Sequence, residues 1–327
     1  MIWSNLNVSN DPISPNQPPA ESDVASQTAT PFVAPAKPRL APEQSPAELI
    51  KRSVAVALNT LFGPCLRSGF GILMYHRVSD IIVGQPRPTW NVTPAQLEEQ
   101  LSGLLRRGFT AWPLQRALEH HEKRRPFPRG VFVVTFDDGY QNNFTQAFPI
   151  LKGLGIPATV FLATRYLDSS QAFPNDSWHL AGSPIVPAET WRPLTTAECL
   201  LMHQSGLIEL AAHTHSHDDY RGRPGYLLAD LQECCAVLSR KFGIERPSFA
   251  LPYGTKHNGF AGPELLAVAR QSGVRCCLTT EPELVTAQAD PFDWSRLFAG
   301  DFDTSATLAA KLNGWFSLAR RFRRRPS

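Results

Sequence analysis

The sequence of 327 residues has no long apolar run, no C-x-x-C pair and little net charge. No stretch approaches the roughly 20 apolar residues that a membrane-spanning helix needs. The six cysteines include two adjacent pairs, so the sequence indicates buried free thiols rather than a cysteine zinc site or a redox motif. The net charge of +3 is too small to indicate a nucleic-acid partner.

The start of the chain also lacks a basic stretch followed by an apolar one, which is the mark of a secretory signal. Residues 1–45 are rich in Pro, Ser, Ala, Asn and Gln and show no periodicity, which is typical of a disordered arm. We therefore expect a cytoplasmic protein. The chain ends in a basic tail, "ARRFRRRPS". Such a tail is usually solvated and less often contacts an anionic membrane surface, which for a cytoplasmic protein would be the inner membrane face.

Between the two ends, strand-like and helix-like segments alternate. A leading helix is expected within 46–69, the alternating domain spans 70–310, and 311–327 holds a helix end and the basic tail. Thr93 with Gln96 and Thr195 with Glu198 have the spacing of capping boxes at helix starts. The alternation predicts βαβ units and a parallel sheet, and seven or so repeats without a G-x-G-x-x-G turn favour an α/β barrel.

Polar residues follow two of the predicted strands. Asp137 and Asp138 come directly after "VFVVTF", and "HTHSH" (213–217) follows "LIELAA". His213 and His217 are four residues apart, which would place both imidazoles on one side of a helical turn. Two histidines and a carboxylate suit a zinc-like divalent ion, whose charge would keep one aspartate ionised while its neighbour stays free to accept a proton.

Each of these signals is weak when it is taken alone. A pair of aspartates after a strand is more often a turn or a helix cap, and an H-x-x-x-H spacing arises often by chance. Their combination at matching strand ends is what favours a metal site, because the carboxyl ends of barrel strands form the working face.

Beyond these residues, the motifs "TFDDGY", "HTHSH" and "FALPYG", with "LMYHRV" before them and "GIPATVFL" between, resemble the polysaccharide deacetylase family. This is carbohydrate esterase family 4, with the nodulation-factor deacetylase homology domain, and the likeness is to its branch with a YH-containing strand. It covers about residues 70–300. The resemblance implies a distorted (β/α)7 barrel that removes acetyl groups, mostly from N-acetylglucosamine units, with one divalent metal, for which zinc is favoured.

The resemblance also implies roles for individual residues. Asp137 matches the catalytic base, Asp138, His213 and His217 match the metal ligands, and the backbone amide of Tyr253 matches an oxyanion donor.

The sequence departs from the family pattern in two places. Many members carry an arginine where this chain has Ala250, so Arg296, after "DPFDW", is our candidate for orienting the base. Trp294 in that stretch is either a sugar-stacking wall or core. No histidine follows His257, so the usual late general acid is missing, and His76 is either its replacement or a core histidine.

A polar insertion at 168–194 carries His179, Trp178 and Trp191. Its aromatic residues can stack on sugars or anchor the loop, and we favour anchoring.

These observations predict a metal-dependent hydrolase that removes N-acetyl groups from an N-acetylglucosamine-containing oligosaccharide or polysaccharide, with that saccharide as its partner. The same metal chemistry would serve an O-acetyl or non-sugar amide hydrolase. A catalytically inactive saccharide-binding member is the alternative from another class, and the two departures are its support.

Overall fold

The computed structural model describes residues 45–65, 69–85, 87–173 and 186–318. Nearly all of the predicted arm at 1–45 lies outside these residues, as do His179 and Trp178 of the predicted insertion and the basic tail from residue 319 onward.

The domain is built on a parallel sheet in the order β10-β1-β5-β6-β7-β8-β9, with β4 added beside β5. Every ladder in it is parallel, so the connections between neighbouring strands cross over through helices. Its strands are β1 Gly71–Tyr75, β4 Thr110–Ala111, β5 Val131–Phe136, β6 Ala158–Leu162, β7 Ile208–Ala212, β8 Phe249–Ala250, β9 Cys277–Leu278 and β10 Leu297–Phe298. A small separate ladder joins β2 (Arg77–Val78) to β3 (Asn91–Val92).

One short segment links the two edges of this sheet. Trp294 pairs with the edge strand β9, donating its backbone N–H to Cys277 and accepting one from Thr279. Three residues later, Leu297 of β10 pairs with Leu73 of β1 at the other edge. The sheet therefore curls into a half-barrel, which confirms the predicted barrel class of fold.

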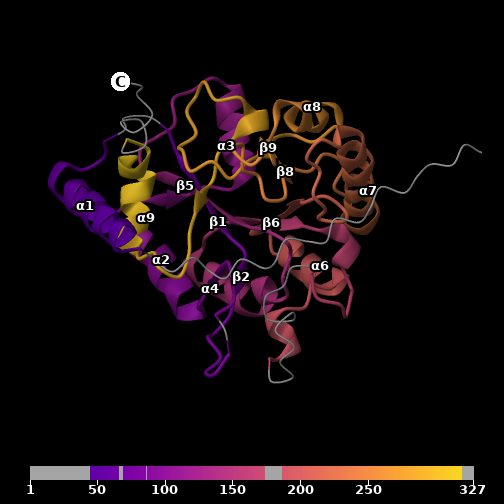
Figure 1. The fold of residues 1–327 in the computed structure, drawn as a ribbon, viewed down its shortest axis with the longest axis horizontal. Coiled ribbons are helices and arrows are strands. Elements are labelled where there is room, and N and C mark those ends of the chain that lie inside the picture. Colours follow the sequence, from indigo (N-terminus) through magenta and orange to yellow (C-terminus); the bar gives the residue numbers. More distant parts are fainter. Residues whose placement is uncertain (1–44, 66–68, 86, 174–185, 319–327) are drawn as a thin grey trace, which may run out of the picture. The chain divides into compact units, whose positions relative to one another are not determined.

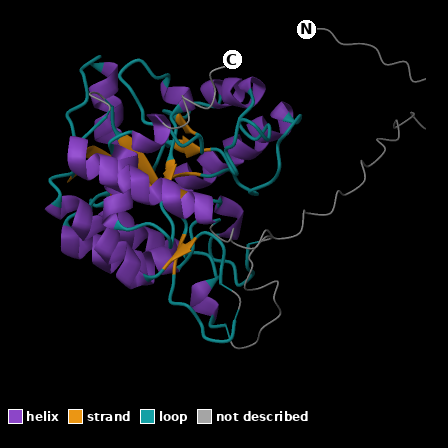
Figure 2. Ribbon diagram, turned by 60° about the vertical axis from the view of Figure 1, so that its left-hand side comes forward, coloured by secondary structure: helices purple, strands orange, loops and turns teal. Residues whose placement is uncertain are grey.

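Helices surround the strands, as Figure 2 shows. They are α1 Pro46–Phe62, α2 Pro94–Arg106, α3 Leu114–Glu122, α4 Phe148–Leu154, α6 Thr196–Gln204, α7 Pro224–Phe242, α8 Pro263–Gln271 and α9 Ser305–Leu312. The capping boxes predicted at Thr93 and Thr195 are confirmed. No described helix combines the length and the apolar character needed to cross a membrane.

The helical segment around Pro149 takes an unusual form. A π-helical turn, Asn143–Ala147, precedes α4, so Pro149 falls in the first turn of α4. Ala147 is already helical, with a φ of -72°, so Pro149 lies inside a continuous helical run. The N–H that proline lacks falls at the wide π turn, where the ordinary i→i−4 ladder is already interrupted.

The two faces of the sheet carry separate apolar clusters, as the alternation of side chains along a strand requires. Leu73 and Val134 belong to the cluster that faces α2, α4 and the other surrounding helices. Ile72, Val133 and Phe161 belong to the cluster on the inner face, which α3 also joins through Leu114 and its neighbours. Side chains two residues apart on a strand lie on the same face, and Val133 of β5 lies on the inner face. Asp137, four residues after Val133, is therefore expected to point toward the inner side.

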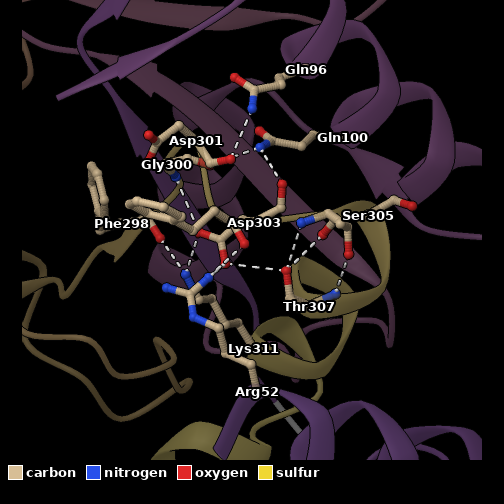
Figure 3. A network of polar contacts seen from close by, with 12 residues as sticks. Arg52, Gln96, Gln100, Phe298, Gly300, Asp301, Asp303, Ser305, Thr307 and Lys311 are labelled. Atoms are coloured by element: carbon tan, nitrogen blue, oxygen red, sulfur yellow. Dashed lines mark hydrogen bonds and ion pairs between the residues drawn. The ribbon is translucent and has the colours of Figure 1, made fainter. Parts of the chain in front are cut away.

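A buried polar network around Asp303 fixes the strand that closes the sheet (Figure 3). Asp303 accepts hydrogen bonds from Arg52 of α1 at 2.8 Å and from Lys311 of α9 at 2.7 Å. Lys311 also donates to the carbonyl of Phe298 at 2.7 Å, and Gln100 of α2 donates to the carbonyl of Asp303 at 2.7 Å. Burial lowers the pKa of Lys311, while the Asp303 carboxylate opposes that shift. The network ties three helices to the end of β10.

Candidate active site

The candidate residues come from the ends of several strands. Asp137 and Asp138 follow β5, His213 follows β7, and Tyr253 lies just beyond β8. His76 separates β1 from β2. The carboxyl ends of parallel strands share one end of a barrel, so residues from distant parts of the chain lie together there.

Asp138, His213 and His217 form one compact group of ligand atoms. Each offers one atom, and these atoms all lie within 4.8 Å of one another. Oδ1 of Asp138 is 3.4 Å from Nε2 of His213 and 3.2 Å from Nε2 of His217. Nδ1 of His213 lies 2.8 Å from the carbonyl oxygen of Ala250 and donates to it, which leaves Nε2 as the ligand atom. The donor set therefore fits a divalent cation.

The two histidines do not share a helical turn, so that part of the prediction is wrong. Residues 213–217 form an irregular loop, and Thr214 and His217 have positive φ angles of 67° and 57°. The backbone N–H of His217 donates to the side chain of Thr214 at 3.1 Å. This bend turns the His217 imidazole back toward His213, with ring centroids 5.0 Å apart.

Asp230 on α7 supports this loop, and no sequence pattern pointed to it. Its carboxylate accepts from the backbone N–H groups of His215 and Ser216 and from the hydroxyl of Ser216 at 2.6 Å. Thr164 holds the ring of His215 at 3.0 Å, which gives that histidine a structural place beside the group.

Opposing influences act on the charges of the group. Burial alone would raise the pKa of Asp138, but hydrogen bonds from His213 and His217 hold it well below its ordinary value. Burial would lower the pKa of His217, and the bond to Asp138 raises it instead. Asp138 is therefore ionised at neutral pH, as a metal ligand must be.

Asp137 is held by Arg296, which reaches it from the start of β10. Nη1 of Arg296 lies 2.5 Å from Oδ1 of Asp137, and the arginine side chain is fully buried. Its guanidinium passes 5.6 Å from the ring of Phe161 on the inner face. Burial would raise the pKa of Asp137, but Arg296 and the nearby imidazoles lower it overall. This chain has Ala250 where many family members carry an arginine, and the arginine that contacts Asp137 is instead Arg296, next to β10.

The second oxygen of Asp137 faces the metal-ligand group. Oδ2 lies 4.0 Å from Nε2 of His213 and 3.9 Å from Nε2 of His76, beyond hydrogen-bonding distance. Burial lowers the pKa of His76, although Asp138 and Asp137 oppose that shift. His76 is thus placed beside the carboxylate rather than in the apolar core.

Exposed aromatic rings flank the group. Trp90 lies 5.3 Å from His76 between ring centroids, is 55% exposed and has a positive φ of 57°. Tyr253 lies 5.2 Å from His217 with a positive φ of 62°. A positive φ strains the backbone of a residue other than glycine, and residues strained in this way are frequent at functional sites. The sequence analysis missed Trp90, because the two-residue strand β3 that follows it leaves almost no periodic signal.

Trp294 is entirely buried against Phe70, with ring centroids 5.4 Å apart, so it is core and not a sugar wall. Trp191 is half-buried at the end of a short 3-10 turn, Ala188–Thr190. Its predicted anchoring role stays a prediction.

Part of the chain that holds most of these site residues matches a known protein family. Residues 124–277 match the family model described as polysaccharide deacetylase. The matched segment includes Asp137, Asp138, His213, His217 and Tyr253, but neither His76 nor Arg296.

The chain is also similar to two curated proteins, both named poly-beta-1,6-N-acetyl-D-glucosamine N-deacetylase. The one from Escherichia coli K12 is 31% identical over 158 residues, which cover 47% of this chain and 22% of that protein. The chain thus spans well under half the length of that relative. The one from Staphylococcus epidermidis is 23% identical over 69% of this chain and 73% of that protein.

Among solved structures, the Streptococcus pyogenes deacetylase PplD is similar in fold, with a TM-score of 0.62 at 18% identity. The superposition covers 76% of this chain and 99% of that one. Together with the matched segment, this likeness agrees with the curled parallel sheet seen here.

Proposed function

We propose that this chain, whose residues 124–277 match the polysaccharide deacetylase model, is a metal-dependent hydrolase. In this proposal it removes N-acetyl groups from an N-acetylglucosamine-containing polysaccharide or oligosaccharide. The names of the curated relatives support both the sugar polymer and the N-acetyl bond. The observation that carries the proposal is the convergence of three ligand atoms within 4.8 Å beside a carboxylate whose free oxygen faces them.

Asp138, His213 and His217 would hold the cation. Their donor set favours zinc, which when bound supplies a positive charge that polarises a carbonyl and makes water more acidic. His213 is fixed for this task by its bond to Ala250, and Asp138 by the loss of its proton.

Asp137 acts as the general base in this proposal. Arg296 occupies Oδ1 and keeps the carboxylate ionised, so Oδ2 is the oxygen that accepts a proton from the attacking water. Water then adds to the acetyl carbon, and the carbonyl oxygen becomes negative. The backbone N–H of Tyr253 is proposed to donate to this oxygen, and a donor of this kind contributes about 100- to 1000-fold in rate.

His76 delivers the proton to the leaving nitrogen. Burial lowers its pKa and keeps it neutral at rest, so it first receives the proton that Asp137 took from water. Because Oδ2 and Nε2 are 3.9 Å apart, this transfer runs through one bridging water. The imidazolium then protonates the amide nitrogen, the C–N bond breaks, and a free amine and acetate leave. One water is consumed for each acetyl group released.

Hydrolysis of an O-acetyl ester or of a non-sugar amide would use the same groups, so the substrate is decided by assay. The inactive binding alternative has less support, because Arg296 lies 2.5 Å from Oδ1 of Asp137 and His76 lies 3.9 Å from its Oδ2. Neither departure from the family pattern therefore leaves Asp137 without a neighbour of the required kind.

The test is the release of free amine and acetate from chitooligosaccharides, from poly-β-1,6-N-acetylglucosamine and from an O-acetylated sugar. We expect equal amounts of amine and acetate from an N-acetylated substrate, loss of both on chelation, and recovery with zinc. Zinc binding with no product from any substrate would refute the enzyme and favour the binder.

A further inference from the structure

An exposed aromatic ring lies on the His76 side of the metal-ligand group. The indole of Trp90 is 55% exposed, and its centroid lies 5.3 Å from that of the His76 ring. Trp90 directly precedes β3, which pairs with β2. A large rigid aromatic side chain offers much contact area to a ligand at little cost in conformational entropy. Its place beside a proposed proton donor is therefore a place where substrate can be held.

The backbone that carries Trp90 is fixed from several directions. Its carbonyl accepts from the backbone N–H of Arg77 at 3.2 Å, within the β2–β3 ladder. β2 follows β1 directly, with His76 between them (Figure 1). The side chain of Asn143 donates to the carbonyl of His76 at 2.7 Å, and that of Asn142 accepts a backbone N–H of β2 at 2.9 Å. His76 and Trp90 are therefore held together by one hydrogen-bonded framework.

The indole ring is supported as well as its backbone. It makes an edge-to-face contact with the ring of Phe298 on β10, with centroids 5.0 Å apart and planes at 87°. Phe298 in turn fills the space beside Gly300, where an added Cβ would lie 2.5 Å from the phenyl ring. Trp90 is thus held in place while more than half of its surface stays open to solvent.

The chemistry of amide hydrolysis decides which part of the substrate lies on this side, and this step rests on the proposed function. The proton donor must reach the leaving nitrogen, and that nitrogen is attached to the sugar ring. His76 is the proposed donor, so the sugar ring lies close to His76 and hence to Trp90. The acetyl oxygen lies on the other side, toward Tyr253, whose ring is 5.2 Å from that of His217.

A pyranose ring suits an indole surface. The substituents of an N-acetylglucosamine unit lie around the rim of its ring, so each broad face presents C–H groups. Such a face buries apolar area against a flat aromatic ring, while the hydroxyl groups at the rim remain in water. A straight-chain amine, such as that of a lysine side chain, has no face of this shape.

We propose that Trp90 is a stacking platform for the sugar ring that carries the N-acetyl group, and so a specificity-determining residue of the proposed deacetylase. The platform contacts a part of the substrate that does not change during the reaction. It therefore strengthens binding of the ground state and of the transition state alike, which lowers KM and leaves kcat nearly unaltered.

The first test measures saccharide binding without turnover. Zinc-loaded protein carrying Asp137→Asn is titrated in a calorimeter with the tetramers of β-1,4- and of β-1,6-linked N-acetylglucosamine. Adding Trp90→Ala should weaken binding of the tighter tetramer about 10- to 100-fold, because a tryptophan anchor often dominates a binding site. Trp90→Phe keeps a flat ring and should stay within about threefold. Leu201→Ala, at an apolar α6 residue that is 56% exposed, is the matched control and should bind normally.

Kinetics with Asp137 intact separate stacking from a cover that only shields His76. Trp90→Ala should raise KM for the tetramer about as much as it weakens binding, with little change in kcat, and Trp90→Phe should restore KM. A fall in kcat with KM unchanged would make Trp90 a cover for His76 and would overturn the proposal.

Two calorimetric results would also overturn it. They are unchanged affinity in Trp90→Ala and no binding of either tetramer to the Asp137→Asn protein. Because Trp90 is exposed, its variants should melt as the unaltered protein does. Calorimetry needs no turnover, so Trp90-dependent binding without product in any assay would refute the hydrolase and leave the platform in place.

Discussion

Two buried aspartates in this protein are each paired with an arginine, and they differ in what their second oxygen meets. Asp303 uses both oxygens: Oδ1 accepts from Arg52 and Thr307, and Oδ2 accepts from Lys311 and the backbone N–H of Gly300. Asp137 gives Oδ1 to Arg296, while Oδ2 faces two imidazoles at 3.9 and 4.0 Å.

The difference separates a carboxylate that holds the fold from one that is available for chemistry. A carboxylate whose two oxygens are both hydrogen-bonded has no free oxygen to accept a proton. Removing it leaves the buried cations that it paired without a counter-charge. A carboxylate bonded on one side stays oriented and ionised while its other oxygen remains free to act as a base. The comparison predicts opposite signatures for mutations at the two residues.

The largest effect is expected at the metal group beside Asp137. Asp138→Ala removes one of three ligand atoms and should weaken zinc binding at least about 100-fold, with deacetylation falling to background. Zinc content after dialysis and amine release are the measurements. Retention of zinc and of activity would show that the group does not hold the metal.

Asp137→Asn should lower kcat about 1000-fold while zinc stays bound, because the amide keeps the shape but cannot accept the proton. The thermal midpoint should change little, in contrast to a change at Asp303. Rate and zinc content are measured on the same sample. An active Asp137→Asn enzyme would assign the base elsewhere.

Asp303→Ala should give the reverse result. It leaves Lys311 and Arg52 without their shared carboxylate and should reduce the free energy of unfolding by about 3–5 kcal/mol. The activity of the protein that remains folded should be close to normal. Urea unfolding measures the loss, and adding Lys311→Met should restore part of it. Unchanged stability would contradict the structural role.

The smallest effect is a shift in pH dependence at Arg296. Arg296 lowers the pKa of Asp137, so Arg296→Met should raise it, and activity requires the ionised carboxylate. The acid limb of kcat/KM should therefore move to higher pH, with about a tenfold loss at the optimum. Arg296→Lys keeps the charge and should leave the limb nearly in place. Identical limbs in all three proteins would remove Arg296 from any role in tuning the base.

Several parts of the fold were readable from local pattern. The strand at 131–136 and the capped helix starts at Thr93 and Thr195 agree with the structure, because each depends on neighbouring residues alone. The prediction did not find β10 or α3, and it gave the His213–His217 pair a helical turn that the loop replaces. A two-residue strand leaves almost no periodic signal.

The sequence by itself determined which chemical groups are present and which of them follow strands: two adjacent aspartates, two histidines four residues apart and a basic tail. Only the tertiary structure decided that Arg296 reaches Asp137 over 159 positions and that Asp303 collects bonds from three helices. The physical reason is that propensity and capping act over a few residues. The direction of a side chain and its partners across the barrel depend on how the sheet curls.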